Sequence, residues 1–301
     1  MRIIVTGATG FIGREVVPLL CDEGHDVHAL GRSEGSDGRV HWHREDLLDG
    51  TDRRRILSEI GASHLLHLAW YAEPPRYWTA IENFDWLEAS LRLVRNFAET
   101  GGQRAVIAGT CAEYDWSAPR LDETTTPLLP ATLYGEAKAS LYRLLTRANA
   151  VLGLSVASGR VFNVYGPFER PQRLLGTLIR AAQERQPAHF SAGTQLRDFI
   201  HVRDVARAFV ALLHSRIDGA VNIGSGDPVS VRRFIETAAR YCDPAPVLEF
   251  GDPSLHRGEV PVLFAGMDRL AGELGFSARY GLEAGLADAV SRGLSRKPPH
   301  R

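Results

Sequence analysis

Residues 2–13, RIIVTGATGFIG, decide which fold this chain adopts. Four β-branched residues in a row indicate a buried strand, a glycine-rich turn follows, and the apolar periodicity of residues 12–23 indicates a helix. Glycines in such a turn let the backbone approach a pyrophosphate, and the N–H groups and dipole at the helix N-terminus bind its negative charge. The segment therefore predicts a dinucleotide-binding site that includes Gly7, Gly10, Phe11, Ile12 and Gly13.

The remainder of the first 160 residues alternates between short apolar runs and longer helical patterns. The runs predict strands at 26–30, 40–42, 64–68, 104–108 and 154–159. The helical patterns cover residues 53–60, 78–100 and 133–152. Regular alternation of this kind implies crossover connections and a parallel sheet with helices on both faces. The expected fold class is therefore α/β, with a Rossmann-type doubly wound parallel sheet.

After Gly166 and Pro167 the alternation becomes less regular. Helices are expected at 174–186, 202–214, 231–241, 267–275 and 282–296, and short strands at 188–191, 197–201, 220–223 and 247–250. We predict a dinucleotide-binding domain over residues 1–166, to which the chain returns at about 198–223. Residues 167–197 and 224–301 are expected to form a smaller C-terminal α/β domain that binds the substrate.

Composition and charge argue against several other classes of protein. The net charge is −1 with both signs interspersed, which gives no footprint for nucleic acid or an anionic membrane surface. No window approaches the roughly 18 apolar residues of a membrane span, and the N-terminus lacks the pattern of a secretory signal. The cysteines, Cys21, Cys111 and Cys242, form no CxxC pair, so neither a metal site nor a disulfide is expected. These features predict a cytoplasmic protein.

Tyr134 and Lys138 stand four residues apart in the helical segment LYGEAKASLYRLL, so they share one helix face. An unperturbed tyrosine has a pKa of about 10, which is too high for acid–base work at neutral pH. A neighbouring ammonium group and the charge of a bound nicotinamide would favour the phenolate and bring that pKa into a useful range. The chain contains only one other lysine, Lys297, and Thr110 supplies a hydroxyl just beyond the expected strand 104–108. An amphipathic helix with a surface lysine is the structural alternative.

The spacing GxxGxxG of the turn, together with these residues, resembles the extended branch of the short-chain dehydrogenase/reductase superfamily. The resemblance implies hydride transfer between a nicotinamide and a carbon that bears oxygen. It assigns the catalytic roles to Thr110, which binds the substrate oxygen, to Tyr134, which moves its proton, and to Lys138. It also implies further cofactor contacts at Asp46, Leu47, Ala69 and again Lys138.

The end of the second expected strand bears on the choice of cofactor. An NAD site usually carries an acidic residue there, whereas an arginine accommodates the 2′-phosphate of NADP. This chain has Arg32 and Ser33, and its first acid is Glu34. We therefore expect NADP, with NAD as the alternative, bound in part by Arg32 and Ser33.

Four segments of the second half resemble the members of this branch that modify nucleotide sugars. They are RVFNVYGP at 160–167, RDFIHVRDV at 197–205, NIGSG at 222–226 and RGE at 257–259. A substrate with two phosphates requires multidentate cationic donors, which arginine provides. The resemblance implies a nucleoside-diphosphate sugar as substrate, bound through Asn163, Arg197, Asn222 and Arg257.

The residues after Thr110 distinguish the reactions of this branch. The 4,6-dehydratases carry Asp and Glu there, where this chain has Cys111 and Ala112, so dehydration is disfavoured. The 3,5-epimerase/reductases place a cysteine one position later than Cys111. We therefore expect an NADPH-dependent reductase of NDP-4-keto-hexoses. The alternatives are an NDP-sugar 4-epimerase that retains its NAD(P), and a non-catalytic NADP-binding protein.

Two further expectations concern surfaces. The aromatic stretch 70–78 is expected to be a loop that contributes to substrate selection. The apolar helices at 78–100 and 133–152 resemble those through which this family forms homodimers.

Overall fold

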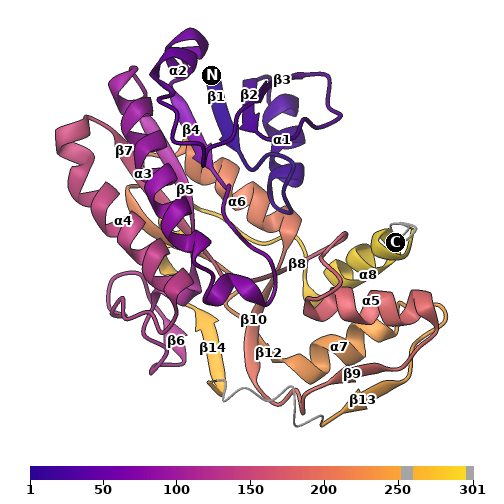
Figure 1. The fold of residues 1–301 in the computed structure, drawn as a ribbon. Coiled ribbons are helices and arrows are strands. Elements are labelled where there is room, and N and C mark those ends of the chain that lie inside the picture. Colours follow the sequence, from indigo (N-terminus) through magenta and orange to yellow (C-terminus); the bar gives the residue numbers. More distant parts are fainter. Residues whose placement is uncertain (252–259, 296–301) are drawn as a thin grey trace.

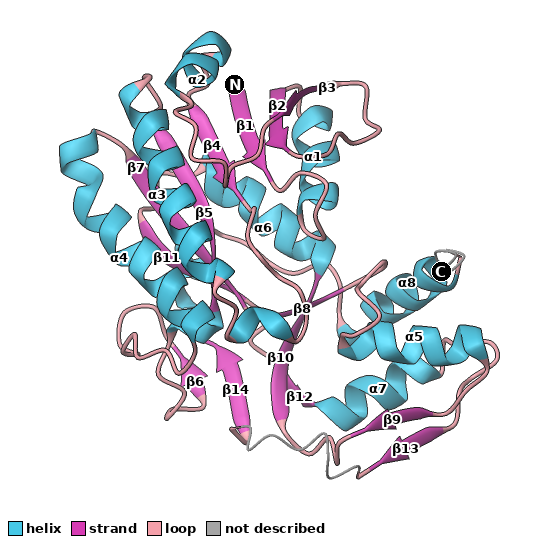
Figure 2. Ribbon diagram, in the orientation of Figure 1, coloured by secondary structure: helices cyan, strands magenta, loops and turns pink. Residues whose placement is uncertain are grey.

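The computed structural model describes residues 1–251 and 260–295. Its centre is a seven-stranded sheet in the order β11-β7-β5-β4-β1-β2-β3 (Figures 1 and 2). Every neighbouring pair in it is parallel. The strands are β1 (Arg2–Thr6), β2 (Asp26–Gly31), β3 (Val40–Arg44), β4 (His64–His67), β5 (Arg104–Thr110), β7 (Ser155–Val161) and β11 (Gly219–Ile223). The predicted α/β fold class is confirmed.

Helices cover both faces of this sheet. On one side lie α1 (Gly13–Asp22) and α6 (Val202–His214). On the other side lie α2 (Arg54–Ile60), α3 (Glu82–Glu99) and α4 (Leu133–Leu152). Successive residues of β1 alternate between the two cores, because side chains of a strand point to opposite faces: Ile3 and Val5 pack with α1, and Ile4 packs with α3.

A smaller region lies below the carboxyl ends of the central strands in Figure 1. It contains a sheet in the order β12-β10-β14-β6, with β8 paired to β10, and the separate pair β13-β9. These strands are β6 (Arg120–Leu121), β8 (Asn163–Tyr165), β9 (Ala188–Phe190), β10 (Leu196–His201), β12 (Pro228–Ser230), β13 (Leu248–Phe250) and β14 (Val262–Ala265). Its helices are α5 (Leu174–Glu184), α7 (Val231–Ala239) and α8 (Leu282–Leu294), which share one apolar core.

Two predicted helices differ from the structure. The segment 78–100 is divided into a 3₁₀ turn at Arg76–Trp78 and the helix α3, which begins only at Glu82. The buried Asn83 fixes this division, because its amide donates to the carbonyl oxygens of Tyr77 and Ala80. The segment 267–275 forms a short π-helix at Asp268–Glu273.

None of the helices within residues 1–251 and 260–295 combines the length and the apolar character that a membrane crossing requires.

Candidate functional site

The glycine-rich turn joins β1 to α1 at the carboxyl edge of the central sheet. The Gly10 N–H donates to Gly7 O over 2.9 Å, which closes the turn. A Cβ atom at Gly13 would lie 2.1 Å from Gly7 O, so only glycine lets the helix begin this close to the turn. No side chain caps the N-terminus of α1. This close backbone cradle at an uncapped helix end fits the pyrophosphate of a dinucleotide.

A cavity of about 260 Å³ opens beside this turn. Among the predicted cofactor residues it is lined by Gly7, Gly10, Arg32, Ser33, Asp46, Leu47 and Ala69. The structure therefore brings together residues from the ends of β1, β2, β3 and β4. The lining also includes Trp42, Glu45, Trp70 and Trp86, which were not among the predicted cofactor residues. Phe11 is half-buried, and neither it nor Ile12 nor Gly13 lines the cavity itself.

We expect Gly13→Ala to weaken binding of a nicotinamide dinucleotide at least about tenfold, which corresponds to about 1.4 kcal/mol. The added methyl group would force the first turn of α1 away from the phosphate-binding cradle. Tryptophan fluorescence reports the titration, because three tryptophans line the cavity. Gly281→Ala is the matched control, since it stands at the N-cap of α8 and its Cβ meets nothing within 4 Å. Equal affinity in Gly13→Ala and the wild type would contradict the assignment of the turn.

The three predicted catalytic residues lie next to one another beside this cavity. Thr110 ends β5, and Tyr134 and Lys138 lie one turn apart near the start of α4. The Lys138 Nζ donates to Ala108 O over 2.8 Å and lies 3.7 Å from the centre of the Trp70 ring, which itself lines the cavity. Gly135 permits this arrangement, because a Cβ there would lie 2.2 Å from Ala112 O. The first turn of α4 can therefore pack directly against the residues that follow Thr110.

The electrostatics of these groups differ from the expectation. Burial raises the pKa of Tyr134 above its ordinary value, the neighbouring Tyr77 raises it further, and a hydrogen bond with Thr110 lowers it. Within the protein, Lys138 does not lower the pKa of Tyr134 as predicted. Burial also lowers the pKa of Lys138 to about 7, against the opposing charge of Glu113. Desolvation thus dominates both groups and favours the neutral phenol and the neutral amine.

A buried ion pair fixes Thr110. Glu113 accepts a hydrogen bond from Thr110 N over 2.8 Å with one carboxylate oxygen and from Arg160 Nε over 2.7 Å with the other. The side chains of Glu113 and Arg160 are 0% and 1% exposed. Arg160 also donates to the hydroxyl of Tyr114. The role of Glu113 was not predicted, although Thr110-x-x-Glu113 is the sequence pattern of a capping box, which the structure forms.

The predicted substrate residues have different surroundings. The Asn222 amide is engaged within the protein, since its oxygen accepts from Tyr114 and its nitrogen donates to the carbonyl oxygens of Leu121 and Gly266. Asn163 donates to Asp198 O over 3.1 Å. The predicted phosphate contact Arg257 lies outside the described residues.

Arg197 acts electrostatically on Cys111, the residue that follows Thr110. The Arg197 guanidinium donates to Leu196 O and Val260 O. Its charge lowers the pKa of Cys111, but burial outweighs this effect and raises that pKa to about 12. The thiol is therefore neutral at physiological pH and is no substitute for the acid–base pair of a dehydratase. Glu113, one position beyond Ala112, is also unsuited to that task, because its carboxylate is committed to Thr110 and Arg160.

Aromatic side chains from the segment 70–78 surround the phenol of Tyr134. The ring centres of Tyr77 and Trp78 lie 5.0 Å and 5.8 Å from that of Tyr134, both edge to face. The ring centre of Trp116 lies 6.5 Å from that of Trp78, also edge to face. The position of these rings is consistent with the expected part of this segment in substrate selection.

Comparison with known proteins places these features in a wider group. The family model for the NAD dependent epimerase/dehydratase family matches residues 3–224. The UDP-glucuronate 4-epimerase of Thermodesulfobacterium geofontis is 27% identical over 96% of this chain and 94% of its own. The dTDP-6-deoxy-L-talose 4-dehydrogenase (NAD(+)) of Aggregatibacter actinomycetemcomitans is 28% identical over 78% of this chain and 88% of its own. The structure of MoeE5 in complex with UDP-glucose and NAD superposes with a TM-score of 0.84 at 32% identity, and covers 97% of this chain and 98% of the other.

Proposed function

The chain belongs to the NAD dependent epimerase/dehydratase family, and on this premise we propose that it is an NAD-dependent 4-epimerase of a UDP-sugar. The observation that carries the proposal is the position of Thr110, Tyr134 and Lys138 beside the cavity at the glycine-rich turn. Relatives named as UDP-glucuronate and UDP-glucose 4-epimerases over more than nine-tenths of this chain support the substrate class. A neighbouring structure that contains UDP-glucose and NAD supports the cofactor.

Bound NAD would supply a hydride acceptor and donor in the cavity beside Ala69 and Trp70. Tyr134 removes the proton from the hydroxyl of the reacting sugar carbon and later returns it to the same oxygen. Thr110 donates a hydrogen bond to that oxygen and so holds it against the phenol. The pKa of Lys138 is about 7, so in its protonated form Lys138 would supply a positive charge that favours the phenolate form of Tyr134 and opposes the effect of burial.

The chemistry available at the site matches transfer at a single carbon. Elimination of water requires a second acid or base, and neither Cys111, Ala112 nor Glu113 supplies one. In an epimerase the oxidised sugar rotates within the site, so that hydride returns to its other face. The same phenol accepts the proton in the oxidation and returns it in the reduction. One acid–base residue is therefore sufficient for the proposed reaction.

The proposed activity is tested by incubating the protein with UDP-glucuronate or UDP-glucose and separating the products by chromatography. Interconversion with the 4-epimer through many turnovers, with no cofactor added, is the expected result. The contradicting result is that the protein does not interconvert the two sugars and instead consumes added NADPH stoichiometrically with a 4-keto sugar nucleotide. The assignment would then change from epimerase to reductase.

A reductase of NDP-4-keto sugars is the second candidate function, favoured by a specific observation. No carboxylate follows β2 at the position that would bind a ribose hydroxyl, and Arg32 and Ser33 line the cavity there instead. The similarity to a dTDP-6-deoxy-L-talose 4-dehydrogenase is in keeping with this candidate. That relative is named as an NAD(+) enzyme and MoeE5 is bound to NAD, so these similarities do not favour the NADP predicted from Arg32.

The variant Arg32→Ala tests whether Arg32 determines the preference between NAD and NADP. If Arg32 binds a 2′-phosphate, the variant weakens NADP binding about 10- to 100-fold, as the loss of one charge-assisted hydrogen bond predicts, and leaves NAD binding within about threefold. Calorimetric titration with each cofactor gives both affinities. Equal weakening of NAD and NADP would remove the assignment of Arg32 to the phosphate.

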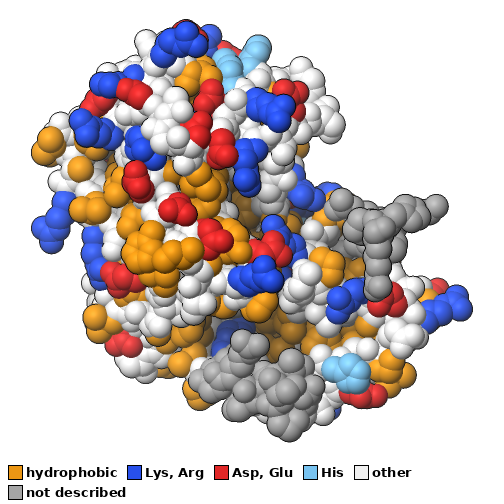
Figure 3. Space-filling view, viewed as in Figure 1, with side chains coloured by type: hydrophobic (Ala, Val, Ile, Leu, Met, Phe, Trp, Pro, Cys, Tyr) orange, Lys and Arg blue, Asp and Glu red, His pale blue; other side chains and the backbone are white. Residues whose placement is uncertain are grey.

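The homodimer remains part of the proposal. Large apolar side chains are exposed on and beside α3 and α4, namely Ile81, Phe84, Leu129, Leu144 and Val151. Figure 3 shows hydrophobic side chains over these helices. Burial of this surface against a second copy of the chain would remove it from water, and exposed apolar patches of this kind commonly mark protein–protein interfaces.

A further inference from the structure

Three histidines and one aspartate meet on one face of the central sheet, at its edge strand β3. In the parallel pairing of β2 with β3, His28 lies opposite His41. Asp26 precedes His28 by two residues and His43 follows His41 by two, so all four side chains point to the same face. Val27 and Ala29, which point the other way, belong to the core beneath α1. The arrangement is therefore a product of strand register.

The distances between these groups match those between ligands of one metal ion. Asp26 Oδ1 lies 3.2 Å from His28 Nε2 and 3.4 Å from His41 Nε2, and all three atoms lie within 4.8 Å of one another. Ligands about 2.0–2.1 Å from a tetrahedral Zn²⁺ ion are separated from each other by about 3.4 Å. The observed spacing thus leaves room for an ion between the three atoms.

The hydrogen bonds around His28 leave one nitrogen available to a ligand. His28 Nδ1 lies 2.9 Å from His43 Nε2, within hydrogen-bond distance. His28 Nε2 is buried and has no hydrogen-bond partner, although it faces the carboxylate. When Nδ1 carries the proton and donates to His43, the Nε2 lone pair is directed toward Asp26, and a cation between them relieves the repulsion. Metal-binding histidines commonly donate their second N–H in this way.

The charge states also suit a metal. Burial lowers the pKa of His28, and His41, His43 and Arg2 lower it further against the opposing effect of Asp26, so the ring is neutral at physiological pH. Arg2 Nε donates to Asp26 Oδ2 over 2.6 Å, which lowers the pKa of this carboxyl and leaves Oδ1 for the ion. A neutral imidazole and an ionised carboxylate are the forms that bind metals.

We propose that Asp26, His28 and His41 bind a divalent transition-metal ion such as Zn²⁺, and that His43 orients His28. Water completes the coordination. The site stands on the amino-terminal half of β2, whereas the cofactor cavity lies at its carboxyl end, so the ion is structural. It links β3 to β2 and thereby secures the strand that carries Trp42, a side chain of the cavity wall.

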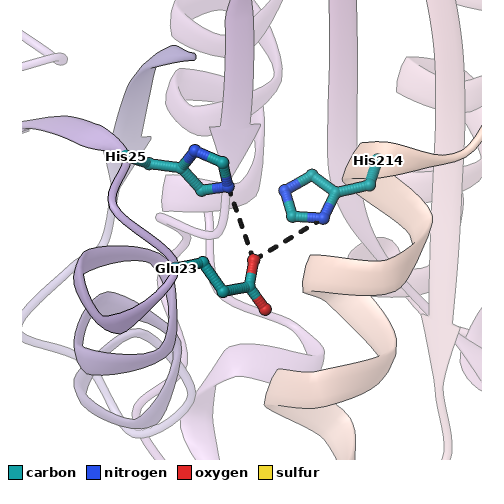
Figure 4. A group of neighbouring side chains, drawn as sticks. All are labelled: Glu23, His25 and His214. Carbon is teal, nitrogen blue, oxygen red and sulfur yellow. Dashed lines mark ion pairs between the residues drawn. The ribbon is translucent and has the colours of Figure 1, made fainter.

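A second group of similar residues is a weaker candidate and serves as a control. Figure 4 shows Glu23, His25 and His214, where Glu23 Oε2 lies 3.4 Å from His25 Nε2 and 3.6 Å from His214 Nδ1. The amino group of Met1 lies 3.2 Å from His25 Nδ1 and can donate to it. The proton of His25 then resides on Nε2 and faces Glu23, so this nitrogen offers no lone pair to a metal ion, although it too is buried without a hydrogen-bond partner.

Calorimetric titration of Zn²⁺ into the chelator-treated chain, freed of any histidine tag, tests the proposal. The wild type is expected to bind Zn²⁺ at the Asp26 site and to gain thermal stability with it. His41→Gln, which changes an exposed side chain, is expected to weaken this binding at least about 100-fold and to abolish the thermal shift. His43→Gln is expected to weaken it about 10- to 100-fold, the usual effect of losing a partner that orients a ligand.

His214→Gln is the matched control and should leave both readouts unchanged. Circular dichroism confirms that each variant is folded. Zn²⁺ affinity and thermal shift that are unchanged in His41→Gln, or that are lost in His214→Gln instead, would overturn the proposal.

Discussion

Tyr134→Phe is expected to lower kcat by about 10²- to 10⁴-fold while cofactor affinity changes little. The variant keeps the ring that packs against Tyr77 and Trp78 and removes only the hydroxyl that moves the proton. Steady-state kinetics with a UDP-sugar and fluorescence titration of the cofactor separate the two effects.

Tyr241→Phe is the control for this loss, since that hydroxyl only donates to Glu283 on the surface of the smaller region. Its kcat should equal that of the wild type. Turnover by Tyr134→Phe within about tenfold of the wild type would show that another group transfers the proton.

Glu113→Ala is expected to reduce the free energy of unfolding by about 3–5 kcal/mol. The substitution leaves the guanidinium of Arg160, which is 1% exposed, without its charged partner. It also removes the acceptor of Thr110 N, so Thr110 loses its fixed position beside Tyr134. Chemical denaturation of the folded variant gives the change in stability, and kcat is expected to fall with it.

An exposed ion pair provides the comparison for this prediction. Arg232 and Glu236 lie one turn apart on α7 with side chains 52% and 45% exposed. Glu236→Ala should cost no more than about 1 kcal/mol, because water screens the pair. A loss of similar size in Glu113→Ala would mean that the buried pair does not hold the end of β5 in place.

The strands and most helices of the central sheet were predictable because each carries its own periodic signal. β1, β5 and α4 lie within a few residues of the predicted bounds. The strands β6, β8, β12 and β14 were not predicted, since each is short and exists only through a partner elsewhere in the chain. β14, for example, pairs with Arg120 and Leu121, more than a hundred residues earlier.

The residues of the candidate site also fall into a group that local motifs predicted and a group that they did not. The glycine turn, Thr110, Tyr134 and Lys138 could be found from local motifs. Trp42 and Trp86 line the cavity only because separate strands and helices converge there, and no spacing in the sequence indicates this. The effect of burial on the pKa of Tyr134 was not predictable for a related reason: a helix pattern predicts which side chains are neighbours but not how far they are removed from water.

The central claim is that hydride leaves one sugar carbon and returns to the same carbon, while Tyr134 transfers the proton of its hydroxyl group. Incubation of the protein with a UDP-sugar deuterated at C4, followed by mass spectrometry and NMR of the epimerised product, tests it directly. We predict that the product retains deuterium at C4, because hydrogen bonded to carbon on the reduced cofactor would not exchange with water. Loss of the label to solvent, or incorporation of solvent hydrogen at C4, would contradict the account.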